Sequence, residues 1–159
     1  MTRIFVDADS CPRQAREMII RFSVRLGVKA IFVANRPIPG ILAELAHMEI
    51  CPAGEGSADN YIAEHAKPWD LILTRDLPLA ERLVEEGISV MDDRGRVFTK
   101  ENIRELRSLR DFVVGLAENG QETIRTSSYG RKELSSFANS LDRELSRLKR
   151  LQGRAVESV

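Results

Sequence analysis

Two carboxylates stand one residue apart where an apolar run ends near the start of the chain. The segment is IFVDADSCP, residues 4–12, and its acids are Asp7 and Asp9. Ending a strand needs only one polar residue and a turn. Two further acids stand at similar junctions, Asp59 in SADNYI and Asp76 in LILTRD. Because clustered carboxylates repel one another when ionised, a stable cluster usually implies a compensating cation.

Carboxylate oxygens favour hard divalent cations such as Mg²⁺ or Mn²⁺, which keep bound waters and meet phosphate substrates. Such an ion can activate a water and stabilise the leaving oxygen when a phosphodiester is hydrolysed. We therefore expect a Mg²⁺- or Mn²⁺-dependent enzyme that hydrolyses phosphodiester bonds. Its expected catalytic residues and metal ligands are Asp7, Asp9, Asp59 and Asp76.

Each of these acids also has an explanation that involves no chemistry, because Asp is a common helix cap. Asp9 can cap the helix that contains Pro12, and Asp59 can cap the helix around Tyr61. Asp76 can cap the helix that follows it. The functional interpretation therefore depends on the coincidence of acids at three junctions, with a paired Asp-x-Asp among them.

Cys11 follows the acidic pair near the start of a helix, a position that can lower the pKa of a thiol. Arg16 is one residue too near for a Cys-x₅-Arg phosphate loop, and neither histidine is adjacent. We expect Cys11 to be a small, partly buried packing residue.

Short β-branched runs alternate with helical patterns in the first half of the chain. The expected strands are residues 3–7, 28–35, 47–54, 70–76 and 88–95. The expected helices are residues 12–26, capped by Ser10 or Cys11, then 41–46, 57–66 and 78–87. This order predicts an α/β protein, a three-layer α/β/α fold with a mainly parallel sheet. If the first and fourth strands are neighbours, the four acids meet at the carboxyl edge of the sheet.

The second half of the chain is predicted to be helical. A helix is expected over residues 100–120, a loose connection over 121–130, and a last amphipathic helix over about 131–151. That last helix carries a row of arginines, which indicates first a solvated face and second a nucleic-acid contact. With Arg75, the arginines expected to contact nucleic acid are Arg143, Arg147 and Arg150.

Composition sets the broad class. A length of 159 residues suits one domain over the whole chain, and we see neither a signal peptide nor a membrane-spanning stretch, so we expect a cytoplasmic protein that does not bind membranes. Residues 1–93 hold ten Lys and Arg against fifteen Asp and Glu, whereas residues 94–159 hold fourteen against nine. Such a division can place cations in one region and attract a polyanion to another, or can be an accident of surface composition.

Several ordered blocks resemble a known family. VDADSCP, SADNYI, DLILTRDLPLAERLVEEG, DRGRVFTKENI and RDF are similar to the bacterial YaiI/YqxD family, uncharacterised proteins regarded as relatives of PIN-domain nucleases. The resemblance runs from residue 3 to about residue 120 and implies a PIN-like fold whose acids bind a divalent metal for RNA or DNA hydrolysis. On this resemblance we expect an endoribonuclease that acts on single-stranded RNA more readily than on DNA. Carried over position by position, the family's acids are Asp7, Asp9, Asp59 and Asp76.

Two departures from the family pattern stand out. Where an Asn-Pro-Arg-Gly turn is expected, this chain has Asp92-Asp93-Arg94-Gly95, which adds acid to the site or merely alters a turn. The usual Gly-Gly-Pro stretch is missing from QETIRTSSYG.

Two other functions compete with the nuclease. A haloacid-dehalogenase-like phosphatase also begins with a strand and Asp-x-Asp, but it expects Thr or Val where Cys11 stands and a Lys that is missing between Thr74 and Asp92. A non-catalytic RNA-binding or regulatory module would use the basic second half and keep the acids as caps. Either function is compatible with a homodimer.

Overall fold

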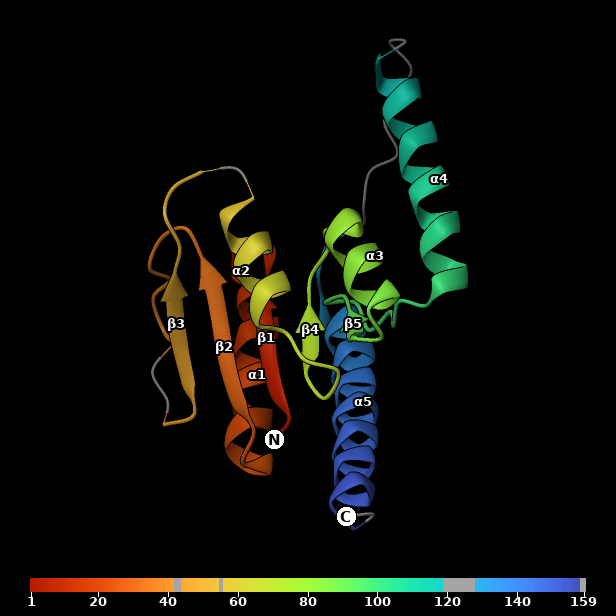
Figure 1. Cartoon of the computed structure of the whole chain (residues 1–159). Helices are drawn as coiled ribbons and strands as arrows, with labels where there is room; N and C mark the ends of the chain where they lie inside the picture. Colours follow the sequence, from red (N-terminus) through yellow and green to blue (C-terminus); the bar gives the residue numbers. More distant parts are fainter. Residues whose placement is uncertain (42–43, 55, 119–127, 158–159) are drawn as a thin grey trace.

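The computed structural model describes residues 1–41, 44–54, 56–118 and 128–157, and its centre is a parallel sheet (Figure 1). The five strands are β1 Arg3–Asp7, β2 Lys29–Ala34, β3 Ala46–Ile50, β4 Leu71–Leu73 and β5 Ser89–Met91. Their order in the sheet is β3-β2-β1-β4-β5. β1 is central and pairs with β2 on one side and β4 on the other, which confirms that the first and fourth strands are neighbours.

Helices cover both faces of the sheet and make three layers. α1 Arg13–Leu26 and α5 Arg131–Glu157 pack on one face; α2 Ser57–His65, α3 Leu77–Glu85 and α4 Lys100–Glu118 belong to the other. Successive strand residues point to opposite faces, so Ile4 and Val6 join the core under α1 and α5 while Phe5 joins the second core. Burial on both faces explains the continuous apolar runs of the strands, and the predicted α/β/α fold is confirmed.

Three local predictions were wrong. The helix expected over residues 41–46 is absent at Glu44 and Leu45, and Ala46 already begins β3; residues 42–43 lie outside the described ranges. Pairing with β2 decides this, because the amide of Ala30 donates to the carbonyl of Leu45 and β3 continues that ladder. Strand β4 ends at Leu73 rather than at Asp76, although the backbone amide of Thr74 still donates a hydrogen bond to the carbonyl of Met91 in β5. Pro12, rather than Ser10 or Cys11, occupies the N-cap position of α1.

The two long helices extend the fold beyond the sheet. α4 begins beside α3 and runs past it, leaving Leu109 and Phe112 exposed (Figure 1). α5 continues past the expected residue 151 to Glu157. The expected connection falls mostly on residues 121–127, which lie outside the described ranges. Within the ranges that are described, no helix is long and apolar enough to cross a membrane.

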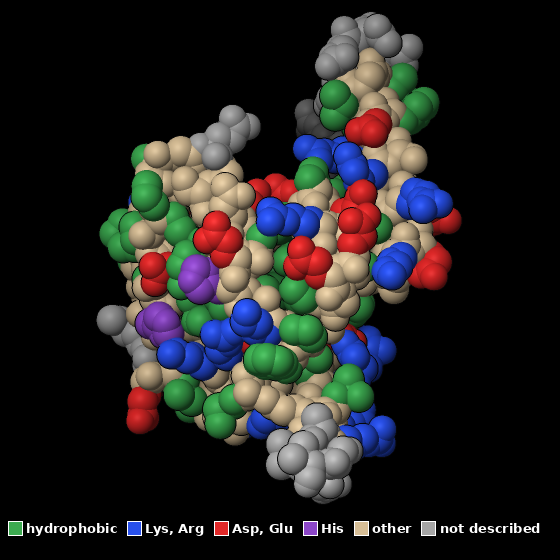
Figure 2. Space-filling model, viewed as in Figure 1, with side chains coloured by type: hydrophobic (Ala, Val, Ile, Leu, Met, Phe, Trp, Pro, Cys, Tyr) green, Lys and Arg blue, Asp and Glu red, His purple; other side chains and the backbone are tan. Residues whose placement is uncertain are grey.

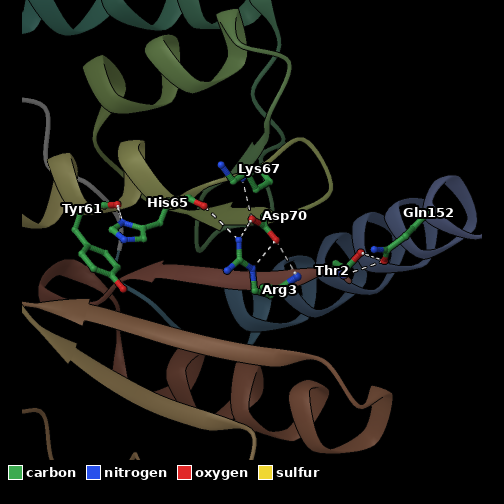
Figure 3. A network of polar contacts seen from close by, with 7 residues as sticks. All are labelled: Thr2, Arg3, Tyr61, His65, Lys67, Asp70 and Gln152. Carbon is green, nitrogen blue, oxygen red and sulfur yellow. Dashed lines mark hydrogen bonds and ion pairs between the residues drawn. The ribbon is translucent and has the colours of Figure 1, made fainter. Parts of the chain in front are cut away.

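A polar network holds the amino edge of the sheet (Figure 3). Asp70, fully buried before β4, accepts hydrogen bonds from the backbone amide and guanidinium of Arg3 and from the amide of Lys67. The side-chain carbonyl of Gln152 accepts from the amide and hydroxyl of Thr2, which ties α5 to the start of the chain. These groups lie at the sheet edge opposite the carboxyl ends of the strands and serve to hold β1, β4 and α5 together.

Candidate functional site

The candidate site lies where β1 and β4 end. Asp7 is the last residue of β1, and Thr74 and Asp76 follow β4. The Thr74 hydroxyl donates to Asp7 Oδ2 at 2.9 Å and accepts from the backbone amide of Asp76 at 3.0 Å. One hydroxyl therefore links the ends of two neighbouring strands and fixes the Asp7 carboxylate relative to the start of α3.

Asp76 caps α3. Its Oδ1 accepts a hydrogen bond from the amide of Leu79 at 2.9 Å, and Pro78 stands in the first turn of the helix. The cap interpretation of Asp76 is thus confirmed. Since that bond uses one of two carboxylate oxygens, the same residue keeps an oxygen for another ligand.

Asp59 lies in the first turn of α2, whose N-cap position is occupied by Gly56, so the cap interpretation of Asp59 was wrong. Its carboxyl group lies close enough to that of Asp76 for the two to influence each other's protonation. Burial first, then the charges of Asp76 and Asp7, raises the pKa of Asp59 to about 6.

Asp7 belongs to the same group of acids, and Asp9 lies at its outer rim. Burial raises the pKa of Asp7, and the charges of Asp76 and Asp9 add to the effect against the lowering bond from Thr74. Asp9 is exposed at the outer rim, where its Oδ2 accepts from the amide of Asn35 beyond β2 at 3.3 Å. The N-terminal residue of α1 is Arg13, and Asp9 makes no cap bond to that helix.

The carboxylate oxygens of these acids meet some of the requirements of a hard divalent cation. Among the residues that the structure describes, no three His, Cys, Asp or Glu side chains form a ready metal shell. Mg²⁺ commonly binds through one or two carboxylates and keeps several waters, so the close Asp59–Asp76 pair beside Asp7 meets its minimum need. The oxygen-only chemistry and the mutual repulsion of these acids fit a cation at this edge.

Asp93, after β5, is a site residue whose role the sequence left open. Its Oδ2 accepts from Nε and from a terminal nitrogen of Arg75, both at 2.7 Å. Its Oδ1 is buried and has no hydrogen-bond partner among the described residues. Asp93 lines a small pocket together with Asp7, Cys11 and Thr74. Burial raises the pKa of Asp93 although the Arg75 guanidinium opposes it.

Asp92 has a different role from its neighbour. Its Oδ1 accepts from the amides of Arg94 and Arg96, each at 2.9 Å, and so folds the turn after β5. The acidic pair at a strand end was the sequence signal for this position, but only the structure assigns Asp92 to the turn and Asp93 to the pocket.

Cys11 is half-buried beside Asp93, and burial, with Asp93 as the next cause, raises the pKa of its thiol to about 12. The predicted packing role is confirmed, whereas the idea that the helix start lowers this pKa was wrong. The thiol is protonated at neutral pH and a poor nucleophile.

The predicted nucleic-acid contacts fall in different places. Arg75 is half exposed and ion-paired with Asp93 at the site. Arg143 lines a hollow beside the turn after β5, at the carboxyl edge. Arg147 instead bonds Ser89, at the start of β5, and Glu144, while Arg150 lies farther along α5 on its exposed side. The structure therefore brings Arg75 and Arg143 to the candidate site's edge of the sheet but not Arg147 or Arg150.

Comparison with known proteins identifies relatives of nearly full length. The family model described as "Uncharacterized BCR, YaiI/YqxD family" matches residues 5–147, a range that includes all four predicted acids. A UPF0178 protein of Treponema pallidum is 44% identical over 95% of this chain and 85% of its own length. A UPF0178 protein of Syntrophobacter fumaroxidans is 42% identical over 95% of this chain and 99% of its own.

These relatives' names describe no activity, and no solved structure gives a significant match. Because the family model matches most of the chain, and these relatives align with nearly all of it, the chain belongs to the YaiI/YqxD family.

Proposed function

We propose that this protein is a Mg²⁺- or Mn²⁺-dependent nuclease of the PIN-like class that hydrolyses phosphodiester bonds in single-stranded RNA in the cytoplasm. The observation that carries the proposal is the group of Asp7, Asp59 and Asp76 at the carboxyl edge, where the charge of Asp76 raises the pKa of both other acids. Keeping mutually repelling carboxylates together costs stability, and a bound cation offsets that cost.

The residues take distinct roles. Asp59, Asp76 and Asp7 would hold the cation, which supplies an activated water and stabilises developing charge on the phosphodiester. The Thr74 hydroxyl orients Asp7, and the Leu79 amide orients Asp76. Asp9, exposed at the rim, is placed to receive a water or to complete the shell. Arg75, held by Asp93, offers its half-exposed guanidinium to a phosphate oxygen.

Incubation of the pure protein with end-labelled RNA and DNA oligonucleotides, in Mn²⁺, in Mg²⁺ or in EDTA, tests the proposal. We expect cleavage of RNA only with metal, and a rise in melting temperature with metal that follows the linkage relation. Asp9→Asn and Asp76→Asn should abolish cleavage, and Asp76→Asn should also remove the metal-induced shift.

Asp142→Asn is the matched control, since this exposed carboxylate lies on α5 away from the cluster. It should keep both cleavage and the metal response. If the protein shows no metal-dependent cleavage and no metal-induced rise in melting temperature, the proposal is wrong. Hydrolysis of p-nitrophenyl phosphate without oligonucleotide cleavage would favour the phosphatase instead.

The non-catalytic RNA-binding module keeps one supporting observation, which is the group of arginines at the turn after β5. It predicts oligonucleotide binding that survives Asp76→Asn and needs no metal. The same assay, read as binding in EDTA, separates it from the nuclease.

A further inference from the structure

An open hollow of about 510 Å³ lies between α5 and the turn after β5. Arginines from two distant segments meet there, two from the turn and one from the helix. The residues that matter are Arg94, Arg96, Arg143, Ser136, Asn139 and Ser140. This is a concave, polar surface with three guanidinium groups, which is the chemistry that recognises phosphate oxygens.

The turn is pinned against α5 by several bonds. The Ser140 hydroxyl donates to the carbonyl of Gly95 at 2.6 Å, and the Tyr129 hydroxyl donates to the carbonyl of Asp93 at 2.6 Å. Gly95 has φ +89°, and a Cβ there would come within 2.5 Å of the Ser136 carbonyl oxygen. Since the backbone is held on both sides, the two turn arginines start from fixed positions. The hollow is therefore built before any ligand arrives.

Among the described residues at the hollow, three arginines stand against two acids, Asp92 and Glu133. Asp92 directs one oxygen to two backbone amides, and Glu133 lies 3.7 Å from one nitrogen of Arg94. Arg143 also donates to the Ser140 hydroxyl at 3.3 Å, which turns its guanidinium toward the loop. Serine and asparagine side chains add neutral donors. The lining thus favours an anion with several oxygens over a cation or an apolar ligand.

The hollow adjoins the carboxylate cluster through Asp93. The carboxylate of Asp93 holds Arg75 in the pocket that Asp7 also lines, whereas its backbone carbonyl meets Tyr129, whose ring lies 5.9 Å from the Arg94 guanidinium. An anion that bridges both places must carry phosphates at intervals along a chain. A nucleic-acid strand has this repeating charge and a free phosphate ion does not.

We propose that Arg94, Arg96 and Arg143 bind a backbone phosphate of a single-stranded nucleic acid, next to the phosphodiester held at the carboxylates. That a phosphodiester is held at the carboxylates rests on the proposed function, whereas phosphate binding in the hollow does not. The subsite contacts phosphate rather than bases, so it sets the position of the strand without reading its sequence.

Fluorescence anisotropy of a labelled single-stranded RNA, measured in EDTA over a range of salt concentrations, tests this binding without turnover. Arg96→Ala combined with Arg143→Ala should weaken binding by about tenfold or more. The slope of log affinity against log salt should become shallower by about 0.7 for each phosphate of a single strand that the variant no longer neutralises. Arg96→Lys with Arg143→Lys should restore part of the affinity, since the charge remains.

Arg21→Ala, on the exposed side of α1, is the matched control and should leave affinity and slope unchanged. Equal weakening in this control, or no weakening in the double variant with an unchanged melting temperature, overturns the inference. Displacement of the RNA by inorganic phosphate at equal phosphate concentration also overturns it, because the site then takes the free ion.

The two proposals can fail separately. Metal-dependent cleavage that is unaffected by the arginine variants would keep the nuclease and reject the phosphate subsite. Binding through the arginines without any cleavage would keep the subsite and reject the nuclease.

Discussion

At the residue scale, Asp76 combines a structural and a chemical task. One of its oxygens caps α3 through the Leu79 amide, and its carboxyl group meets that of Asp59. A cap needs only a side-chain oxygen, whereas a cation site needs charge, so the amide of Asn can do the first task but not the second. This difference lets the two tasks be separated experimentally.

Asp76→Asn should therefore leave the metal-free protein as stable as the wild type or more stable at pH 7, because the cap is kept and a repelling charge is removed. Asp76→Ala should be less stable than Asp76→Asn by about 1 kcal/mol, the usual contribution of an N-cap. Urea unfolding in EDTA measures both. A less stable Asp76→Asn would show that the carboxylates do not repel one another in the folded protein.

At the element scale, the turn after β5 depends on how closely its backbone approaches α5. Gly87 and Gly95 both have positive φ, at +79° and +89°, but only Gly95 faces a neighbouring backbone. For any other residue, a left-handed conformation costs about 1–2 kcal/mol. At Gly95 the added Cβ also meets the Ser136 carbonyl, a helix atom that cannot rotate away.

We expect Gly87→Ala to cost about 1 kcal/mol and Gly95→Ala about 2–4 kcal/mol of unfolding free energy. Chemical denaturation with matched m-values checks both, with Gly87→Ala as the control for the effect of φ alone. Equal costs would mean that the turn can move off α5, and the pinned arginine hollow would lose its support.

At the scale of the whole molecule, the two edges of the sheet have different roles. The amino edge holds a buried acid, Asp70, whose oxygens accept several hydrogen bonds, and the carboxyl edge holds Asp7 and Asp59, whose pKa values are raised by burial and by neighbouring acids. On the face seen in Figure 2, acidic and basic side chains intermingle over α3 and α4. The acidic first half and basic second half of the chain therefore do not produce single-sign surfaces over these two helices.

Asp70→Asn should cost about 2–4 kcal/mol, because a buried charged acceptor is removed and the Arg3 guanidinium is left without its partner charge. Glu81→Gln is the control. It breaks the partly exposed pair with Arg107 and should cost less than about 1 kcal/mol. Thermal and urea unfolding compare the two, and similar losses would contradict the structural role given to Asp70.

The sequence predicted local secondary structure better than it predicted contacts between residues far apart in the chain. Apolar periodicity predicted all five strands near their places and the helices between most of them, because strand and helix patterns are local. Placing Asp7 and Asp76 at one edge required only that β1 and β4 be neighbours, which parallel topology favours. The short helix expected over residues 41–46 was wrong, since that segment carries no pattern strong enough to oppose pairing of β3 with β2.

The tertiary structure decided what each polar group does. Asp76 raises the pKa of Asp59 from a neighbouring helix, and Asp70 stabilises the fold through Arg3. Asp93 binds Arg75, whereas Asp92 accepts hydrogen bonds within a turn. These roles depend on burial and on residues far away in the chain. Both change the pKa of a carboxyl group, but neither leaves a mark on the sequence around it. The sequence by itself determined the sheet, its helices and the edge where the acids gather; only packing across that edge decided which acids meet and which arginines stand beside them.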